Sequence, residues 1–149
     1  MELIIRMAAD SSLISKAIRF ITWSDFSHCD FVLPEGGFLG AVPGKGTVLH
    51  DTKYPVEKYF KVVFPEGSKV NPAKILAFAR AQVGVGYDYL GVVGFAFHKN
   101  WQLDTSWFCS ELITAAIETE YVLFNEKPWK ISPRDLAISD VLVPYDPTN

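Results

Sequence analysis

Cys109 and His28 are the residues of this sequence whose chemistry is most readily combined. Cys109 follows Trp107-Phe108 and stands where an amphipathic helix is expected to begin. A thiol at a helix N-terminus faces unpaired N–H groups and the positive end of the helix dipole, which together favour the nucleophilic thiolate. The same amides can stabilise an oxyanion on a carbonyl that the sulfur attacks. The alternative is that Cys109 only packs in the core, as free cysteines usually do.

His28 opens an expected strand, Ser27 to Pro34. Because side chains alternate along a strand, His28 and Asp30 should share one face while Cys29 points to the other. A histidine beside an aspartate can act as a base whose tautomer is held by the carboxylate. We therefore assign Cys29 to packing. A purely structural, hydrogen-bonded histidine is the alternative for His28.

The periodicity of the apolar residues and the positions of turn-forming residues predict the strands and helices that would position these residues. Expected strands cover residues 2–7, 27–34, 38–42, 47–50, 58–64 and 141–144, and expected helices run from Asp10 or Ser11 to about Thr22, over 71–84, over 109–120, and from Ser132-Pro133. In the first helix, one apolar stripe is formed by Ile14, Ala17, Ile18 and Ile21. The pattern predicts an α+β fold in which an antiparallel sheet of about five or six strands packs with helices.

The length and composition of the chain limit the classes of protein to which it can belong. The 149 residues suit one domain, 1–149, and the balance of 14 basic and 17 acidic residues gives a net charge of −3. No Lys/Arg run stands out, so we expect no nucleic-acid partner. The longest apolar stretch, 91–97, is far shorter than the ~20 residues of a membrane span. The N-terminus lacks the features of a secretion signal, so we expect synthesis in the cytoplasm and leave the site of action open.

No cofactor or metal is expected from local motifs. The glycine patterns at 84–91 and 40–46 lack the spacing and context of nucleotide-binding loops. The two cysteines have no zinc-type flanking sequence, and the histidines His28, His50 and His98 form no i, i+4 pair. Ligands distant in sequence can still converge in space.

The aromatic stretch from Tyr87 to Trp107, with Phe95, Phe97 and Trp101, has two interpretations. Core packing under a long loop is the favoured one. A substrate lid or a lipid-facing surface is the other.

Four segments taken together resemble a known family. SHCDFVL, FLGAVPGKGTVLHD, GVGYDYLG and WFCSELI resemble the circularly permuted branch of the NlpC papain-like cysteine peptidases, which includes YiiX-like proteins and is similar in layout to lecithin retinol acyltransferase. The resemblance covers roughly residues 11–137, and Phe-Cys-Ser-Glu-Leu is its most specific part. It implies a permuted papain-like fold in which a strand histidine precedes a helix-borne cysteine.

The resemblance also implies roles for individual residues. Cys109 corresponds to the nucleophile and His28 to the general base. Tyr87 corresponds to an aromatic hydroxyl near the nucleophile that helps to hold the substrate or the oxyanion. Glu111 belongs to the Cys-Ser-Glu motif and is expected to cap or brace the helix start.

One position departs from the family pattern. The family usually orients its histidine with a polar residue on the next strand, where this sequence has Gly40. Glycine has no side chain to bond an imidazole, so Asp30, a backbone carbonyl or a water must serve instead. The third member of the site is therefore left open.

The activity implied is that of a cysteine amidase or peptidase working through a thioester, with cell-wall (peptidoglycan) peptide amides of bacterial origin as substrate. A lipid-directed acyltransferase or thioesterase is the first alternative. A non-catalytic phage or virion-associated binding module is the second, favoured by the glycine at residue 40. The expected partner is thus a small peptide or lipid-like amide or ester.

Overall fold

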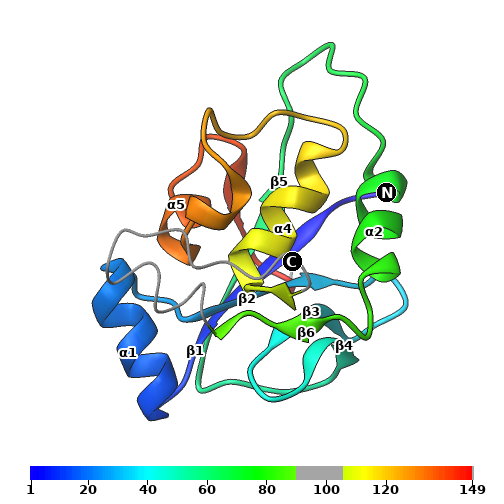
Figure 1. Cartoon of the computed structure of the whole chain (residues 1–149). Coiled ribbons are helices and arrows are strands. Elements are labelled where there is room, and N and C mark those ends of the chain that lie inside the picture. Colours follow the sequence, from blue (N-terminus) through cyan, green and yellow to red (C-terminus); the bar gives the residue numbers. More distant parts are fainter. Residues whose placement is uncertain (90–105, 149) are drawn as a thin grey trace.

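A six-stranded antiparallel sheet forms the centre of the computed structural model, which describes residues 1–89 and 106–148 (Figure 1). The strand order is β4-β3-β2-β1-β5-β8. The strands are β1 (Ile4–Ala9), β2 (His28–Val32), β3 (Phe38–Val42), β4 (Gly46–His50), β5 (Val56–Val62) and β8 (Leu142–Tyr145). The helices are α1 (Leu13–Thr22), α2 (Pro72–Ala81), α4 (Cys109–Glu118) and α5 (Pro133–Ala137), with a 3-10 turn at Pro128–Lys130. The predicted α+β class is confirmed, and the segment near residue 142 is an edge strand as expected.

The register of the central strands decides which polar residues meet. β1 lies between β2 and β5, and Arg6 stands opposite Asp30 on one side and Tyr59 on the other. Its neighbours Ile5 and Met7 point to the opposite face and are fully buried. The sheet therefore has an apolar face and a second face on which a buried arginine sits.

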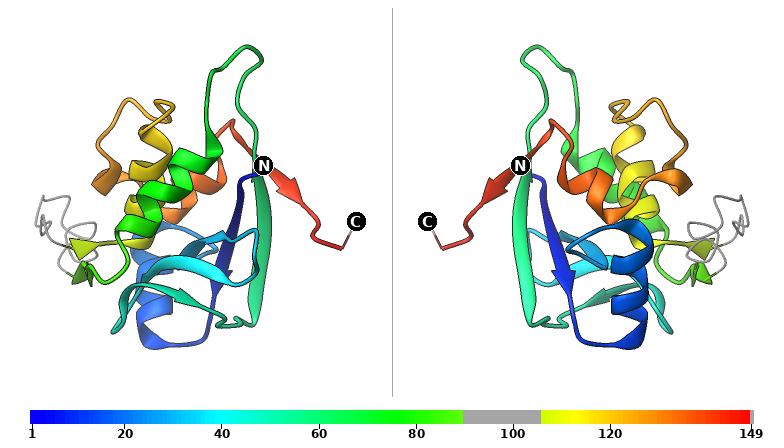
Figure 2. Two further views of the ribbon diagram at one scale, coloured as in Figure 1. Left: turned by 90° about the vertical axis from the view of Figure 1, so that its right-hand side faces the viewer. Right: turned by 90° about the vertical axis from the view of Figure 1, so that its left-hand side faces the viewer.

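Helices α2 and α4 cover the apolar face of the sheet, as the two views of Figure 2 show. α4 packs on β2 and β3, and α2 packs beside α4. The core between these layers includes Ile5, Met7, Cys29, Phe31, Leu39, Ile75, Leu112, Ile113, Ala116 and Ile117. Burial of this apolar surface holds the N-terminus of α4 against the start of β2.

Helix α1 differs from the prediction in its start and its orientation. Its N-cap is Ser12, whose hydroxyl accepts the Ser15 N–H at 3.1 Å, whereas Asp10 accepts the N–H of Ser12. Of the predicted apolar stripe only Ile18 is buried, and Ile14 is 48% exposed. The polar Ser15 takes an inward position because its hydroxyl bonds Ser27.

A short parallel pair, absent from the predicted elements, leads into α4. It joins β6 (Gly86–Tyr87) to β7 (Ser106–Trp107), and the Asp88 N–H donates to the Trp107 carbonyl at 3.0 Å. The interpretations of the aromatic stretch concern Phe95, Phe97 and Trp101, which lie outside the described residues. Across 1–89 and 106–148, no helix has the length and apolar character needed to cross a bilayer.

Candidate active site

Cys109 is the first residue of α4. Phe108 occupies the N-cap, and its N–H donates to the Glu111 carboxylate at 3.2 Å. Glu111 therefore braces the start of the helix that carries the thiol. The Cys109 side chain is fully buried, and its sulfur lies 3.8 Å from the Ser27 carbonyl oxygen, to which the neutral thiol can donate.

His28 and Asp30 share a face of β2, as strand alternation predicts. Nε2 of His28 lies 2.6 Å from Oδ1 of Asp30. With Nε2–H donating to the carboxylate, Nδ1 is the nitrogen left to interact with other groups. His28 and Cys109 also interact electrostatically, since each shifts the pKa of the other. Asp30 and His28 are thus hydrogen-bonded, and the charge of His28 in turn acts on Cys109.

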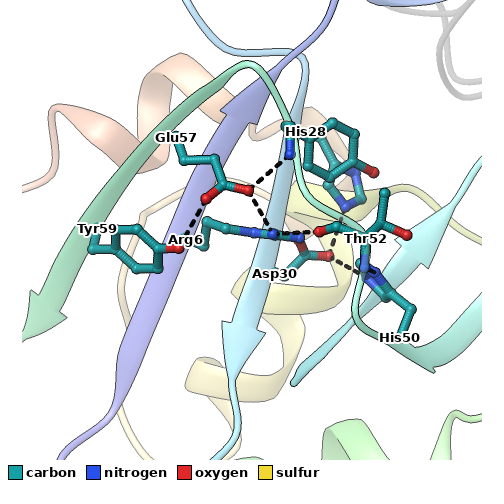
Figure 3. A network of polar contacts seen from close by, with 8 residues as sticks. Arg6, His28, Asp30, His50, Thr52, Glu57 and Tyr59 are labelled. Carbon is teal, nitrogen blue, oxygen red and sulfur yellow. Dashed lines mark hydrogen bonds and ion pairs between the residues drawn. The ribbon is translucent and has the colours of Figure 1, made fainter. Parts of the chain in front are cut away.

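Asp30 is held by residues from two other strands (Figure 3). Arg6 in β1 donates to Oδ2 through Nε, at 3.1 Å, and through Nη2. His50 at the end of β4 lies with Nε2 3.1 Å from Oδ1. Both oxygens of this fully buried carboxylate therefore have partners, as a buried charge requires.

Arg6 is itself fixed on every side. Its Nη1 donates to the Thr52 carbonyl at 2.7 Å and to the Glu57 carboxylate at 2.9 Å. Tyr59 donates to the other oxygen of Glu57 at 3.0 Å, and the guanidinium carbon lies 3.3 Å from the centre of the Phe38 ring. Figure 3 shows Arg6 between the two carboxylates. This network prevents Asp30 from turning away from His28.

The charges of the site favour an ion pair between Cys109 and His28. Burial alone would raise the pKa of Cys109, but hydrogen bonds with Cys29 and His28 and the charge of His28 lower it to about 6. Burial would lower the pKa of His28, but the charge and hydrogen bond of Asp30, followed by those of Cys109, raise it to about 10. Burial opposes ionisation of Asp30, yet contacts with His28, His50 and Arg6 hold its pKa below the usual range. Both shifts favour the thiolate and imidazolium form of the pair over the neutral form.

Cys29 and Tyr87 also adjoin the sulfur. Cys29 is fully buried, as expected for a packing residue, and its interaction with Cys109 helps to lower the pKa of that thiol. Tyr87 is 8% exposed, and its ring stacks edge-on to Phe108 with centroids 6.1 Å apart. Burial, and then the charges of Cys109 and Cys29, raise the pKa of Tyr87, so its hydroxyl stays protonated and able to donate.

Sequence reasoning missed Arg6 and His50. The available signal for Arg6 was a lone arginine inside an otherwise apolar strand, IIRMAA. His50 had no local signal, because its approach to Asp30 depends on the pairing of β3 with β4, which sets Phe38 opposite His50. Long-range pairing of this kind is not encoded in residue spacing.

His28, Asp30 and His50 also form a possible metal-binding group, with one ligand atom of each within 4.8 Å of the others. Their hydrogen bonds do not fit a cation. Nδ1 of His50 accepts the Thr52 N–H at 3.3 Å, so the proton of the neutral ring is on Nε2, the nitrogen that would have to bind the metal. Asp30 is also neutralised by the guanidinium of Arg6. The arrangement suits N–H donors around a carboxylate.

Comparisons with known proteins bear on the fold. No family model matches the chain, and no curated protein matches it in sequence. Among solved structures, the crystal structure of the metalloprotein YiiX from Escherichia coli O157:H7 is similar, with a TM-score of 0.68 and 18% identity over 98% of this chain and 96% of that chain. The chain therefore has a YiiX-like fold, which is the layout implied by its four motif segments.

Proposed function

We propose that the chain is a cysteine hydrolase of the amidase or peptidase type, with Cys109 as nucleophile and His28 as acid and base. The observation that carries the proposal is the chain of contacts from Arg6 through Asp30 and His28 to Cys109 at a helix N-terminus. A cysteine that only packs in the core does not need a charged histidine held beside it by Asp30 and Arg6. A nucleophile needs one, because only the thiolate attacks.

In the proposed reaction the Cys109 thiolate attacks the substrate carbonyl carbon and forms a C–S bond. Amides of the first turn of α4 stabilise the oxyanion. The His28 imidazolium gives its proton to the leaving nitrogen as the C–N bond breaks, which leaves a thioester. Neutral His28 then takes a proton from water, whose oxygen attacks the thioester and releases the acid and the thiolate. Tyr87 supports this sequence as a further hydroxyl donor.

Cell-wall peptide amides are the proposed substrates, on the basis of the family resemblance. A lipid-directed acyltransferase or thioesterase would use the same thioester and differ only in the acyl donor and acceptor. Purified protein should be incubated separately with peptidoglycan fragments and with phospholipids, and the products of each identified by mass spectrometry. Release of peptides with new termini supports the amidase, and release or transfer of acyl groups supports the lipid enzyme.

Iodoacetamide labelling tests the proposal without knowledge of the substrate. Wild-type Cys109 should react well below the ~8.5 midpoint of a free thiol, while His28→Ala should lose that advantage. Cys29 serves as the internal reference thiol, because burial and Cys109 raise its pKa well above the ordinary value. If Cys29 reacts first and Cys109 is inert, the chain is better described as a non-catalytic binding module.

Metal binding is the rival suggested by the name of the similar structure. The hydrogen bonds of His50 and Arg6 oppose it in this chain. Zinc titration followed by calorimetry separates the two ideas, since a metal on His28 would consume the proposed base. Binding that is abolished by His50→Gln, together with inhibition of Cys109 alkylation by zinc, would favour the metal and count against the hydrolase.

A further inference from the structure

The outer face of helix α1 exposes large apolar side chains that the sheet does not cover. Leu13 and Phe20 are each 83% exposed, Trp23 is 82% exposed and Ile14 is 48% exposed. The face directed inward holds Ser15 and Ile18. A surface helix normally buries its apolar side and presents its polar side to water. Here a strongly amphipathic helix is turned so that much of its apolar surface faces outward.

The backbone conformation of Trp23 is a second observation that core packing does not explain. This residue ends α1 with φ 52 and ψ 37, in the left-handed region that favours glycine. A bulky residue in this conformation is uncommon, and the exposed indole makes no contribution to the core that would compensate for the strain. Scattered exposed apolar residues are ordinary, but these lie together on one helix and its cap.

The charges on α1 indicate what covers this face. Leu13–Thr22 contains Lys16 and Arg19 and no Asp or Glu, although the whole chain has a net charge of −3 and Asp10 and Asp25 flank the helix. Lys16 is exposed, whereas Arg19 is partly buried and donates to the Asp10 carbonyl at 3.3 Å. Helices that lie in a membrane interface have this composition, with Leu, Phe and Trp on one side and Lys and Arg beside them. Trp and Phe are suited to that depth because their rings are large, and the indole N–H still reaches polar headgroups.

Helix α1 is also connected to the candidate active site. The Ser15 hydroxyl lies 2.6 Å from the Ser27 hydroxyl, and the Ser27 carbonyl oxygen lies 3.8 Å from the Cys109 sulfur. We propose that the outer face of α1 docks the protein on the surface of an anionic lipid bilayer, with Phe20 and Trp23 at the boundary of headgroups and acyl chains. The site beside α1 is then held close to that surface. This docking does not depend on the chemistry proposed for Cys109.

Vesicle co-sedimentation tests the docking surface. The full chain is mixed with vesicles of phosphatidylcholine alone and with vesicles that also contain phosphatidylglycerol. Wild type should bind the anionic vesicles, and the double variant Phe20→Ser/Trp23→Ser should bind them at least about tenfold more weakly. Added salt should weaken wild-type binding, because Lys16 and Arg19 contribute through charge.

A matched control uses exposed apolar residues elsewhere, since Val122 is 72% exposed and Ile138 is 68% exposed. Val122→Ser/Ile138→Ser should bind like wild type, and thermal melting should show all these variants folded. Cys109→Ala should also bind like wild type, which separates docking from catalysis. Absence of wild-type binding, or equal binding by both double variants, overturns the proposal. A wild-type dimer that Phe20→Ser/Trp23→Ser dissociates in analytical ultracentrifugation also overturns it, in favour of a second copy as the occupant.

Discussion

The carboxylate of Asp30 fills the space that a side chain at residue 40 would need. A Cβ atom built on Gly40 would come within 2.1 Å of Oδ1 of Asp30, the oxygen that lies 2.6 Å from Nε2 of His28. Gly40 is therefore not a lost member of the site. Its lack of a side chain is the condition under which Asp30 can reach His28 from the same strand.

Gly40→Ala is expected to push the Asp30 carboxylate away from His28. The clash is with a buried, fully bonded carboxylate, so we expect a loss of stability of about 1–3 kcal/mol, as for other overpacked sites. Alkylation of Cys109 near neutral pH should slow at the same time. Chemical denaturation and labelling rates measure the two effects. Unchanged labelling in a folded Gly40→Ala protein would show that Asp30 does not orient the histidine.

Moving the orienting group to the neighbouring strand gives a stricter version of this experiment. Asp30→Ala should slow the labelling of Cys109, and adding Gly40→Asn to Asp30→Ala should restore part of the rate. The amide oxygen would then approach His28 from the strand used in the family pattern. Gly40→Asn alone, which keeps the clash with Asp30, should not improve on wild type.

The reactivity of Cys109 should rise as pH increases through about 6, because the pKa of the thiol is lowered to about 6. Between this value and about 10, the raised pKa of His28, the imidazolium persists beside the thiolate. His28→Ala removes the charge and hydrogen bond of His28, so that only Cys29 still opposes the effect of burial on the pKa of Cys109. Its reactivity midpoint should therefore move upward. Labelling kinetics across pH, with thiolate absorbance as a second readout, measure the midpoint.

Cys29 should tune Cys109 through its thiol. Cys29→Ala removes a hydrogen bond that lowers the pKa of Cys109, so the reactivity midpoint should rise. Cys29→Ser keeps a donor at the same position and should leave the midpoint nearer to wild type. Both variants remove the reference thiol, so loss of all labelling in Cys29→Ser/Cys109→Ala identifies the reacting residue. Identical midpoints for alanine and serine would mean that Cys29 only packs.

Arg6→Met should destabilise the fold strongly. The substitution leaves the buried Asp30 carboxylate without its guanidinium partner, a change that typically costs about 3–5 kcal/mol. Lys61, in β5, forms an exposed ion pair with Glu2, and Lys61→Met should change stability by only about 0–1 kcal/mol. Urea unfolding of the two variants compares them directly. Arg6→Met/Asp30→Asn should recover stability relative to Arg6→Met, because the unpaired charge is removed.

Local rules were enough to place several parts of this protein from its sequence. The period of two along Ser27–Pro34 put His28 and Asp30 on one face, and the structure joins them at 2.6 Å. The change to helical period after Phe108 placed Cys109 at the start of α4. These features depend on residues near one another in the chain, so their spacing alone predicts them.

Tertiary structure decided the contacts that complete the site. The antiparallel register of β1 sets Arg6 against Asp30, and the packing of α4 on β2 brings the Cys29 and Cys109 thiols together across 80 residues of sequence. The spacing of apolar residues in α1 likewise did not predict which face of the helix points outward. The Ser15–Ser27 hydrogen bond, which joins distant segments, helps to set the orientation of this helix. Each of these depends on strand pairing or on packing between distant segments. Periodicity shows which residues of an element share a face, but only the assembled sheet and helices determine what that face meets.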